Sequence, residues 1–134
     1  MAALDLVQCD HATAHRVHAG RSHAARGPAR DRSVTRVTKP IWFSGVDLDA
    51  LNGRHAKDIN GHIGIEMTAF GPDWLAARMP ADGRTRQPMG ILHGGASVVL
   101  AETLASAAAN LCVDPEKAYC VGQEVNANHL RAVT

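Results

Sequence analysis

The sequence predicts an α+β fold in which a long helix packs against an antiparallel sheet, and three segments lead to this prediction. Between Gly95 and Leu111 the chain is dense in alanine and has no proline or further glycine, which favours a helix. Residues 62–70 alternate in polarity, and residues 74–80 follow after a Gly-Pro-Asp turn, as in a β-hairpin. Residues 119–129 return to the composition of a strand.

The length, charge and cysteine content exclude several classes of protein. A chain of 134 residues is enough for one domain, and a net charge of +1 gives no global attraction to nucleic acid or to an anionic membrane. Three cysteines without a Cys-x-x-Cys spacing fit neither a disulfide framework nor a zinc site, and they favour a reducing compartment. No apolar run reaches the roughly 20 residues that span a bilayer, and no signal peptide is recognisable. We therefore expect a soluble, cytoplasmic protein without nucleic-acid or membrane partners.

Residues 1–39 differ from the rest of the chain. They carry six arginines and one lysine against three aspartates, and they have few large apolar residues. Such a segment cannot bury enough surface to offset its ordering entropy. We predict a disordered or non-family extension over 1–39, followed by the folded domain over 40–134. A solvated tail is preferred over a metal site at His11 and His15; a transit peptide or a start codon set too far upstream remain alternatives.

The elements of 40–134 follow in order. A short helix with Asp47 and Asp49 near its start, and with Val46, Leu48 and Leu51 as its apolar residues, is expected to end near Gly53. The strand over 62–70 would turn Ile63, Ile65, Met67 and Ala69 to one face, and residues 81–90 form a polar loop. The long helix over 95–111 should end before Asp114-Pro115, and the final strand should continue past His129.

Glu102 is the unusual residue of the long helix. Apolar side chains surround most of that helix, which predicts burial, and a buried carboxylate is costly unless it is paired or functional. Ser106 lies four residues further on, on the same face, and offers a hydroxyl partner. The pattern therefore makes Glu102 a candidate functional group.

Two glycines supply a second candidate group. Gly94 and Gly95 stand at the helix N-terminus, where N–H groups lack partners inside the helix and can stabilise an oxyanion. A glycine N–H together with a carboxylate makes a minimal acyl-transfer site. However, Gly94 and Glu102 are eight residues apart, about 12 Å along a helix, which is too far for both to reach one carbonyl carbon. The sequence therefore predicts a symmetric homodimer, in which the helix N-terminus of one chain faces Glu102 of the other.

These residues resemble those of a known family. The segments "RTRQPMGILHGGASVVLAETLASAAANLC" and "VGQEVNANHLRA" are similar to hotdog-fold acyl-CoA thioesterases of the phenylacetate-degradation and 1,4-dihydroxy-2-naphthoyl-CoA type. The resemblance implies hydrolysis of an aryl- or hydroxyaryl-CoA, as in menaquinone biosynthesis, by a homodimer or tetramer. It implies no metal and no cofactor, since CoA is part of the substrate. Its implied site residues are Glu102 as nucleophile or general base, Gly94 as carbonyl-polarising donor, His93 and Gln87 as positioning groups, and Gly95, Ser106 and His129 around the substrate.

The resemblance also leaves alternatives. Family members continue through about three more strands, so 40–134 is expected to be a partial domain, apparently truncated at the C-terminus, with open sheet edges and impaired activity. A non-catalytic dimerisation or acyl-CoA-binding module is the alternative function. A third possible function is that of a hotdog dehydratase, in which His93 would act together with Glu102. The His-Gly-Gly loop disfavours it, because that loop points to the hydrolases.

Overall fold

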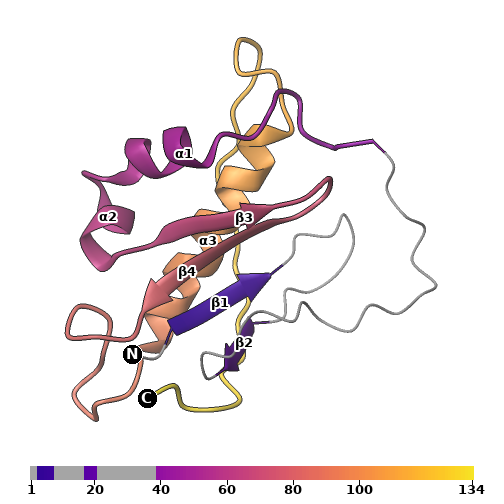
Figure 1. Cartoon of the computed structure of the whole chain (residues 1–134). Helices are drawn as coiled ribbons and strands as arrows, with labels where there is room; N and C mark the ends of the chain where they lie inside the picture. Colours follow the sequence, from indigo (N-terminus) through magenta and orange to yellow (C-terminus); the bar gives the residue numbers. More distant parts are fainter. Residues whose placement is uncertain (1–2, 8–16, 21–38) are drawn as a thin grey trace.

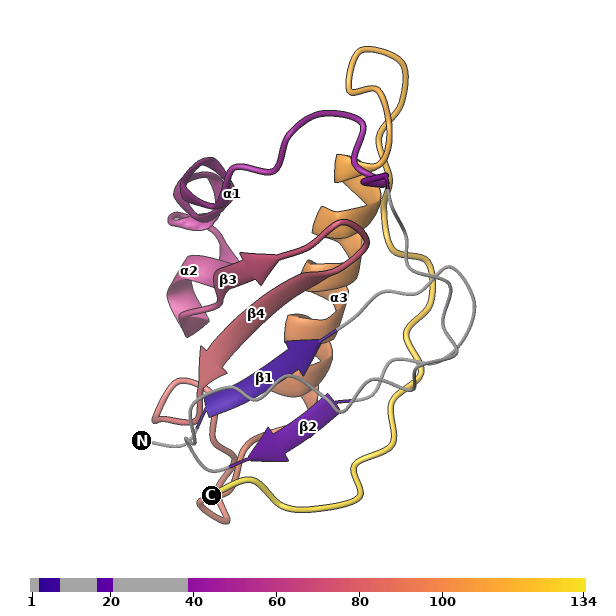
Figure 2. The same ribbon diagram turned by 45° about the vertical axis from the view of Figure 1, so that its right-hand side comes forward.

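The computed structural model describes residues 3–7, 17–20 and 39–134, the first two ranges by their backbone. One layer is an antiparallel sheet whose strands lie in the order β2 (Val17–Gly20), β1 (Ala3–Val7), β4 (Leu75–Pro80) and β3 (Glu66–Phe70). The helix α3 (Gly94–Leu111) lies across one face of this sheet (Figures 1 and 2). Two shorter helices, α1 (Leu48–His55) and α2 (Ile59–Ile63), lie beside the β3 edge. The predicted α+β architecture, a long helix on an antiparallel sheet, is confirmed.

The helix α1 begins where Asp47 caps it, as predicted, and runs two residues beyond Gly53. Its Asn52 side chain holds the edge of β3, because its amide accepts from the Met67 N–H at 2.8 Å and donates to the Met67 carbonyl at 3.1 Å. The helix α2 was not predicted. Residues 62–63, expected to open a strand, close α2 instead, since Gly64 ends that helix with a left-handed φ of 76°.

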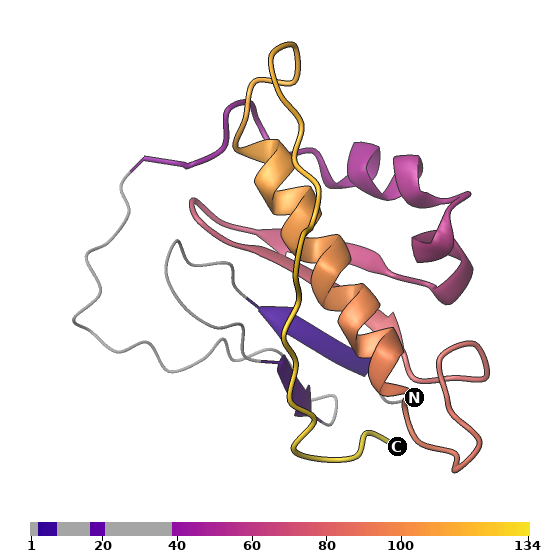
Figure 3. The ribbon, with the colours of Figure 1, turned by 180° about the vertical axis from the view of Figure 1, so that it is seen from behind.

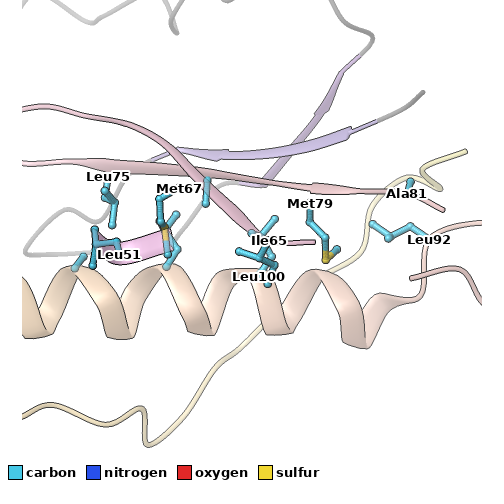
Figure 4. Packing of buried hydrophobic residues seen from close by; sticks show 11 residues of the cluster. Leu51, Ile65, Met67, Leu75, Met79, Ala81, Leu92 and Leu100 are labelled. Atoms are coloured by element: carbon cyan, nitrogen blue, oxygen red, sulfur yellow. The ribbon is translucent and has the colours of Figure 1, made fainter. Parts of the chain in front are cut away.

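The hairpin of β3 (Glu66–Phe70) and β4 (Leu75–Pro80) supplies the sheet side of the core. Along the predicted apolar face of β3, Ile65 and Met67 are buried, whereas Glu66 and Thr68 are exposed. The strand β4 turns Leu75, Ala77 and Met79 inward against α3, as Figure 4 shows for Leu75 and Met79. The hairpin and its inward face are therefore as predicted, apart from an irregular register between Met67 and Ala69.

The helix α3 is buried along one stripe rather than all round. Ser97, Leu100, Leu104 and Ala108 face the sheet and are buried, while most other positions are half-buried. Within this single chain the helix is therefore not buried on every side as predicted, because the sheet covers one face and an irregular segment covers the other only in part. Within the described residues, none of the helices has the length and apolarity needed to cross a bilayer.

The segment after α3 is not a strand, so the prediction for 119–129 is wrong. Residues 118–130 have no regular secondary structure and run along the face of α3 that is turned away from the sheet (Figure 3). Asn110 fixes the start of this path by bonding both the N–H (2.9 Å) and the carbonyl (2.8 Å) of Cys120. The Leu92 N–H donates to the Val133 carbonyl at its end. A strand needs a neighbouring strand, and here the neighbour is a helix.

Two short segments of residues 1–39 are described by the structure, and both are strands. The disordered or non-family extension over 1–39 stays a prediction. The strand β1 (Ala3–Val7) pairs with β4 along Ala3↔Pro80 to Val7↔Ala76, and β2 (Val17–Gly20) pairs with β1. Strand pairing uses main-chain groups, so an open edge of β4 can accept a segment whatever its composition. The other residues before Lys39, and the side chains of the N-terminal histidines, lie outside the described residues. The boundary at residue 40 stays a prediction.

Leu100 tests the packing of α3 on the sheet. Its side chain has an exposed fraction of 0% and lies beneath Met79 and Ile65 (Figure 4). Leu100→Ala is expected to lower the free energy of unfolding by about 3 kcal/mol, because it removes buried contacts and leaves a cavity. Urea denaturation measures the change. Leu130→Ala is the matched control, since Leu130 is 95% exposed; equal losses in the two variants would contradict the described packing.

Candidate active site

His93 caps the N-terminus of α3. It is extended at φ −70° and ψ 128°, and its Nδ1 accepts from the Gly95 N–H at 2.9 Å. Its carbonyl accepts from the Ala96 N–H, also at 2.9 Å. The N–H of Gly94, the first helical residue, has no hydrogen-bond partner among the residues that the structure describes. One donor at the positive end of the helix dipole is thus left for a ligand.

Ser97 and His129 hold the next peptide group. The buried Ser97 hydroxyl donates to the Gly94 carbonyl at 2.7 Å, and His129 Nε2 lies 2.8 Å from that hydroxyl and 3.2 Å from that carbonyl. A carbonyl only accepts, so Nε2 carries the proton and donates in this arrangement. Ser97 was missed in the sequence, although it lies one turn after Gly94; His129 was expected in the substrate pocket and lies at the helix N-terminus.

Glu102 lies on the opposite side of α3 from the sheet. It is half-buried rather than buried, and Ser106 Oγ donates to its Oε1 at 2.9 Å. The predicted Glu102–Ser106 pair is therefore present. Gly122, in the segment that runs along α3, comes against the same carboxylate. A glycine inside a predicted strand signals a close approach of another group, and that signal could have identified it.

Gln87 belongs to a tight turn before α3. Its N–H donates to the Ile91 carbonyl at 2.9 Å, and its carbonyl accepts from the Gly90 N–H, where φ is 78°. The Gln87 side chain accepts from the Met89 N–H at 3.2 Å. These bonds keep Gln87 within its own turn, and none of its hydrogen bonds among the described residues reaches another predicted site residue.

The polar loop that precedes α3 sets the position of His93. Thr85 is buried and donates to the Pro80 carbonyl at 2.7 Å, and its own carbonyl accepts from the His93 N–H at 2.8 Å. Arg84 bonds the Asp82 carboxylate at 2.7 Å, which lowers the Asp82 pKa to about 2. The two Thr85 hydrogen bonds therefore tie the loop to the end of β4 and fix the place where His93 begins the helix.

The predicted site residues fall into two groups within one chain. His93, Gly94, Gly95 and His129 meet at the N-terminus of α3, whereas Glu102 and Ser106 meet about two turns further along it. Among the described residues, no group of three or more His, Cys, Asp or Glu side chains is placed to hold a metal ion. A long helix across one face of an antiparallel sheet is the architecture of the hotdog class.

Comparison with known proteins identifies the family. The model of the thioesterase superfamily matches residues 89–134. A candidate esterase of Pseudomonas aeruginosa is 54% identical over 93 residues, and the 1,4-dihydroxy-2-naphthoyl-CoA hydrolase of Escherichia coli is 48% identical over 92. The structure of a thioesterase mutant from P. aeruginosa superimposes with a TM-score of 0.68 at 53% identity, over 69% of this chain and 67% of that one. The chain belongs to the thioesterase superfamily and has its hotdog fold.

The match covers only part of the relatives. The aligned region covers 69% of this chain, 64% of the length of the Pseudomonas esterase and 67% of the length of the E. coli hydrolase. The name of the E. coli protein gives an aromatic acyl-CoA as its substrate. The Pseudomonas structure is that of a variant in which a glutamine is replaced by alanine.

Proposed function

We propose that this protein hydrolyses an acyl-CoA thioester to a free acid and CoA. Glu102 acts either as the general base that deprotonates water or as the nucleophile that forms an acyl-enzyme anhydride. In both routes the thioester oxygen gains negative charge, the C–S bond breaks and the CoA sulfur leaves and takes up a proton. In the first route the oxygen of water forms the new bond to the carbonyl carbon; in the second, water then hydrolyses the anhydride, which releases the acid and restores the Glu102 carboxylate. The Gly94 N–H stabilises the charged oxygen.

The proposal rests on one observation: the Glu102 carboxylate and the Gly94 N–H each keep hydrogen-bonding capacity that no described residue uses. The Glu102 carboxylate is held through one oxygen by Ser106, and no second donor to it is found among the described residues, which leaves its other oxygen available. The Gly94 N–H likewise has no partner among those residues. One unengaged acceptor and one unengaged donor are what attack on a carbonyl requires.

The spacing on α3 supports a site shared between two chains. Because about 12 Å of helix separates Gly94 from Glu102, one chain cannot apply both to one carbonyl. Two chains related by a twofold axis, with their α3 helices antiparallel, would form two complete sites. A homodimer is therefore part of the proposal.

An aryl- or hydroxyaryl-CoA is the proposed substrate class, supported by the name of the E. coli relative. The test is to add benzoyl-CoA to the purified chain and follow free CoA with a thiol reagent, while measuring binding of the same thioester by calorimetry. Release of CoA above the rate without protein is expected. Binding without release would favour the acyl-CoA-binding module, and neither binding nor release would contradict both functions.

A mixing experiment tests the shared site. A Glu102→Ala chain and a Gly94→Pro chain are each expected to lack activity. Refolded together in equal amounts, they should recover about a quarter of the wild-type rate, because half the dimers are mixed and each mixed dimer has one intact site of two. Activity is read from CoA release. No recovery in dimers shown by sedimentation to be mixed would contradict a site made from two chains.

A further inference from the structure

Gly122 lies directly against the Glu102 carboxylate. It is exposed, in the segment that runs along α3 away from the sheet (Figure 3). A Cβ built on Gly122 would overlap Glu102 Oε1 and would stand 2.6 Å from Oε2. Two residues earlier, both main-chain groups of Cys120 are bonded by Asn110, so the segment is tied to α3 close to this point.

Glycine is required at residue 122 because a side chain would have no room there, not because the backbone has an unusual conformation. Gly64 and Gly90 are the glycines with positive φ among the described residues, and Gly122 is not one of them. An alanine could therefore adopt the Gly122 backbone without strain. Its methyl group would fall on the end of a flexible side chain, so the expected result is a displaced carboxylate rather than an unfolded chain.

The oxygen that the methyl group would displace is also the one that Ser106 holds. Ser106 Oγ donates to Glu102 Oε1 at 2.9 Å, and Oε1 is the atom that a Cβ at residue 122 would overlap. A half-buried glutamate has several accessible rotamers, and a single hydrogen bond from a residue four positions along the helix holds it only weakly. The main chain at Gly122 and the Ser106 hydroxyl together confine the Glu102 carboxylate more strongly than the hydroxyl alone would.

We infer that Gly122 is a positioning residue for Glu102: its lack of a side chain leaves the space in which Ser106 holds the carboxylate ready to react. The expected effect of Gly122 on turnover rests on the proposed function, whereas the contact between Gly122 and Glu102 does not. It adds a residue from the segment after α3 to the site.

The first test is Gly122→Ala. Its kcat for CoA release is expected to fall by about 100-fold, since a displacement of about 1 Å costs that much, while KM and the melting temperature change little. Gly83→Ala is the matched control, because Gly83 is exposed and a Cβ there would have no atom within 4 Å. Equal kcat values for the two variants would overturn the inference.

A double-mutant cycle separates positioning from a general structural effect. Glu102→Asp shortens the side chain by one methylene and leaves room for a methyl group at residue 122. Adding Gly122→Ala to Glu102→Asp is therefore expected to cost less than about threefold in kcat. If Gly122→Ala lowers kcat by the same factor in the wild-type chain and in Glu102→Asp, Gly122 does not act through Glu102, and the inference is overturned.

A spectroscopic test does not depend on turnover. The chain has four glutamates, Glu66, Glu102, Glu116 and Glu124, so a protein labelled with ¹³C at the glutamate carboxyl gives few signals. The Glu102 signal, assigned by its loss in Glu102→Gln, is expected to move in Gly122→Ala and to stay in Gly83→Ala. An unmoved signal would overturn the inference. A moved signal in a chain without turnover would support the contact and count against the proposed function alone.

Discussion

Replacing Glu102 by glutamine is expected to lower kcat for CoA release by about 10³-fold, within the range that a positioned acid or base contributes. Glutamine has nearly the size of glutamate and can still accept from Ser106 Oγ, which now donates to Glu102 at 2.9 Å. The amide, however, neither takes a proton from water at neutral pH nor attacks a thioester. The loss should therefore appear in kcat, with a small change in KM and in stability.

Glu116→Gln is the control for the Glu102 substitution. Glu116 is exposed in the turn after α3 and keeps its main-chain bond to Asp114. Both variants are compared with wild type for CoA release from benzoyl-CoA and for thermal melting. Wild-type kcat in Glu102→Gln would reject Glu102 as the reacting group, whatever the substrate.

Replacing Gly94 by proline is expected to lower kcat by about 10²–10³-fold, because it removes the N–H proposed to stabilise the oxyanion. Proline is favoured at the first residue of a helix, which is where Gly94 stands. The preceding His93, at φ −70° and ψ 128°, already has the backbone that proline requires of its neighbour. The substitution therefore deletes one donor with little cost to α3.

Gly94→Ala is the matched control. Like proline, alanine places a Cβ about 3.0 Å from the His129 ring, but it keeps the N–H. A kcat near wild type in Gly94→Ala and a large loss in Gly94→Pro would assign the effect to the donor. Equal losses would assign it to crowding of His129 and would reject the role of the Gly94 N–H.

Local patterns were sufficient where neighbours in sequence are neighbours in space. The bounds of α3, the pairing of Glu102 with Ser106 and the inward face of the hairpin follow from helix and strand periodicity. Gly94 at the start of α3 follows from the glycine pair itself. None of these depends on which element packs against which, so the sequence predicted them.

Residues that meet across long separations could not be predicted in this way. Gly122 against Glu102, and His129 beside Ser97 and Gly94, depend on the path of 118–130 along α3. Strand composition suggested a strand there, but a strand exists only where another strand offers its main-chain groups. The pairing of β1 with β4 has the same cause: an open sheet edge recruits backbone, and composition does not predict which segment it recruits.

The sequence by itself therefore determined the helix, the hairpin, the carboxylate and the glycines, and through them the family. Only the tertiary structure decided how exposed Glu102 is, which groups remain unengaged at Gly94, and which glycine borders the carboxylate. The physical reason is that hydrogen bonds within a helix or a turn are specified by residues a few positions apart, whereas burial and long-range contact depend on how whole elements pack.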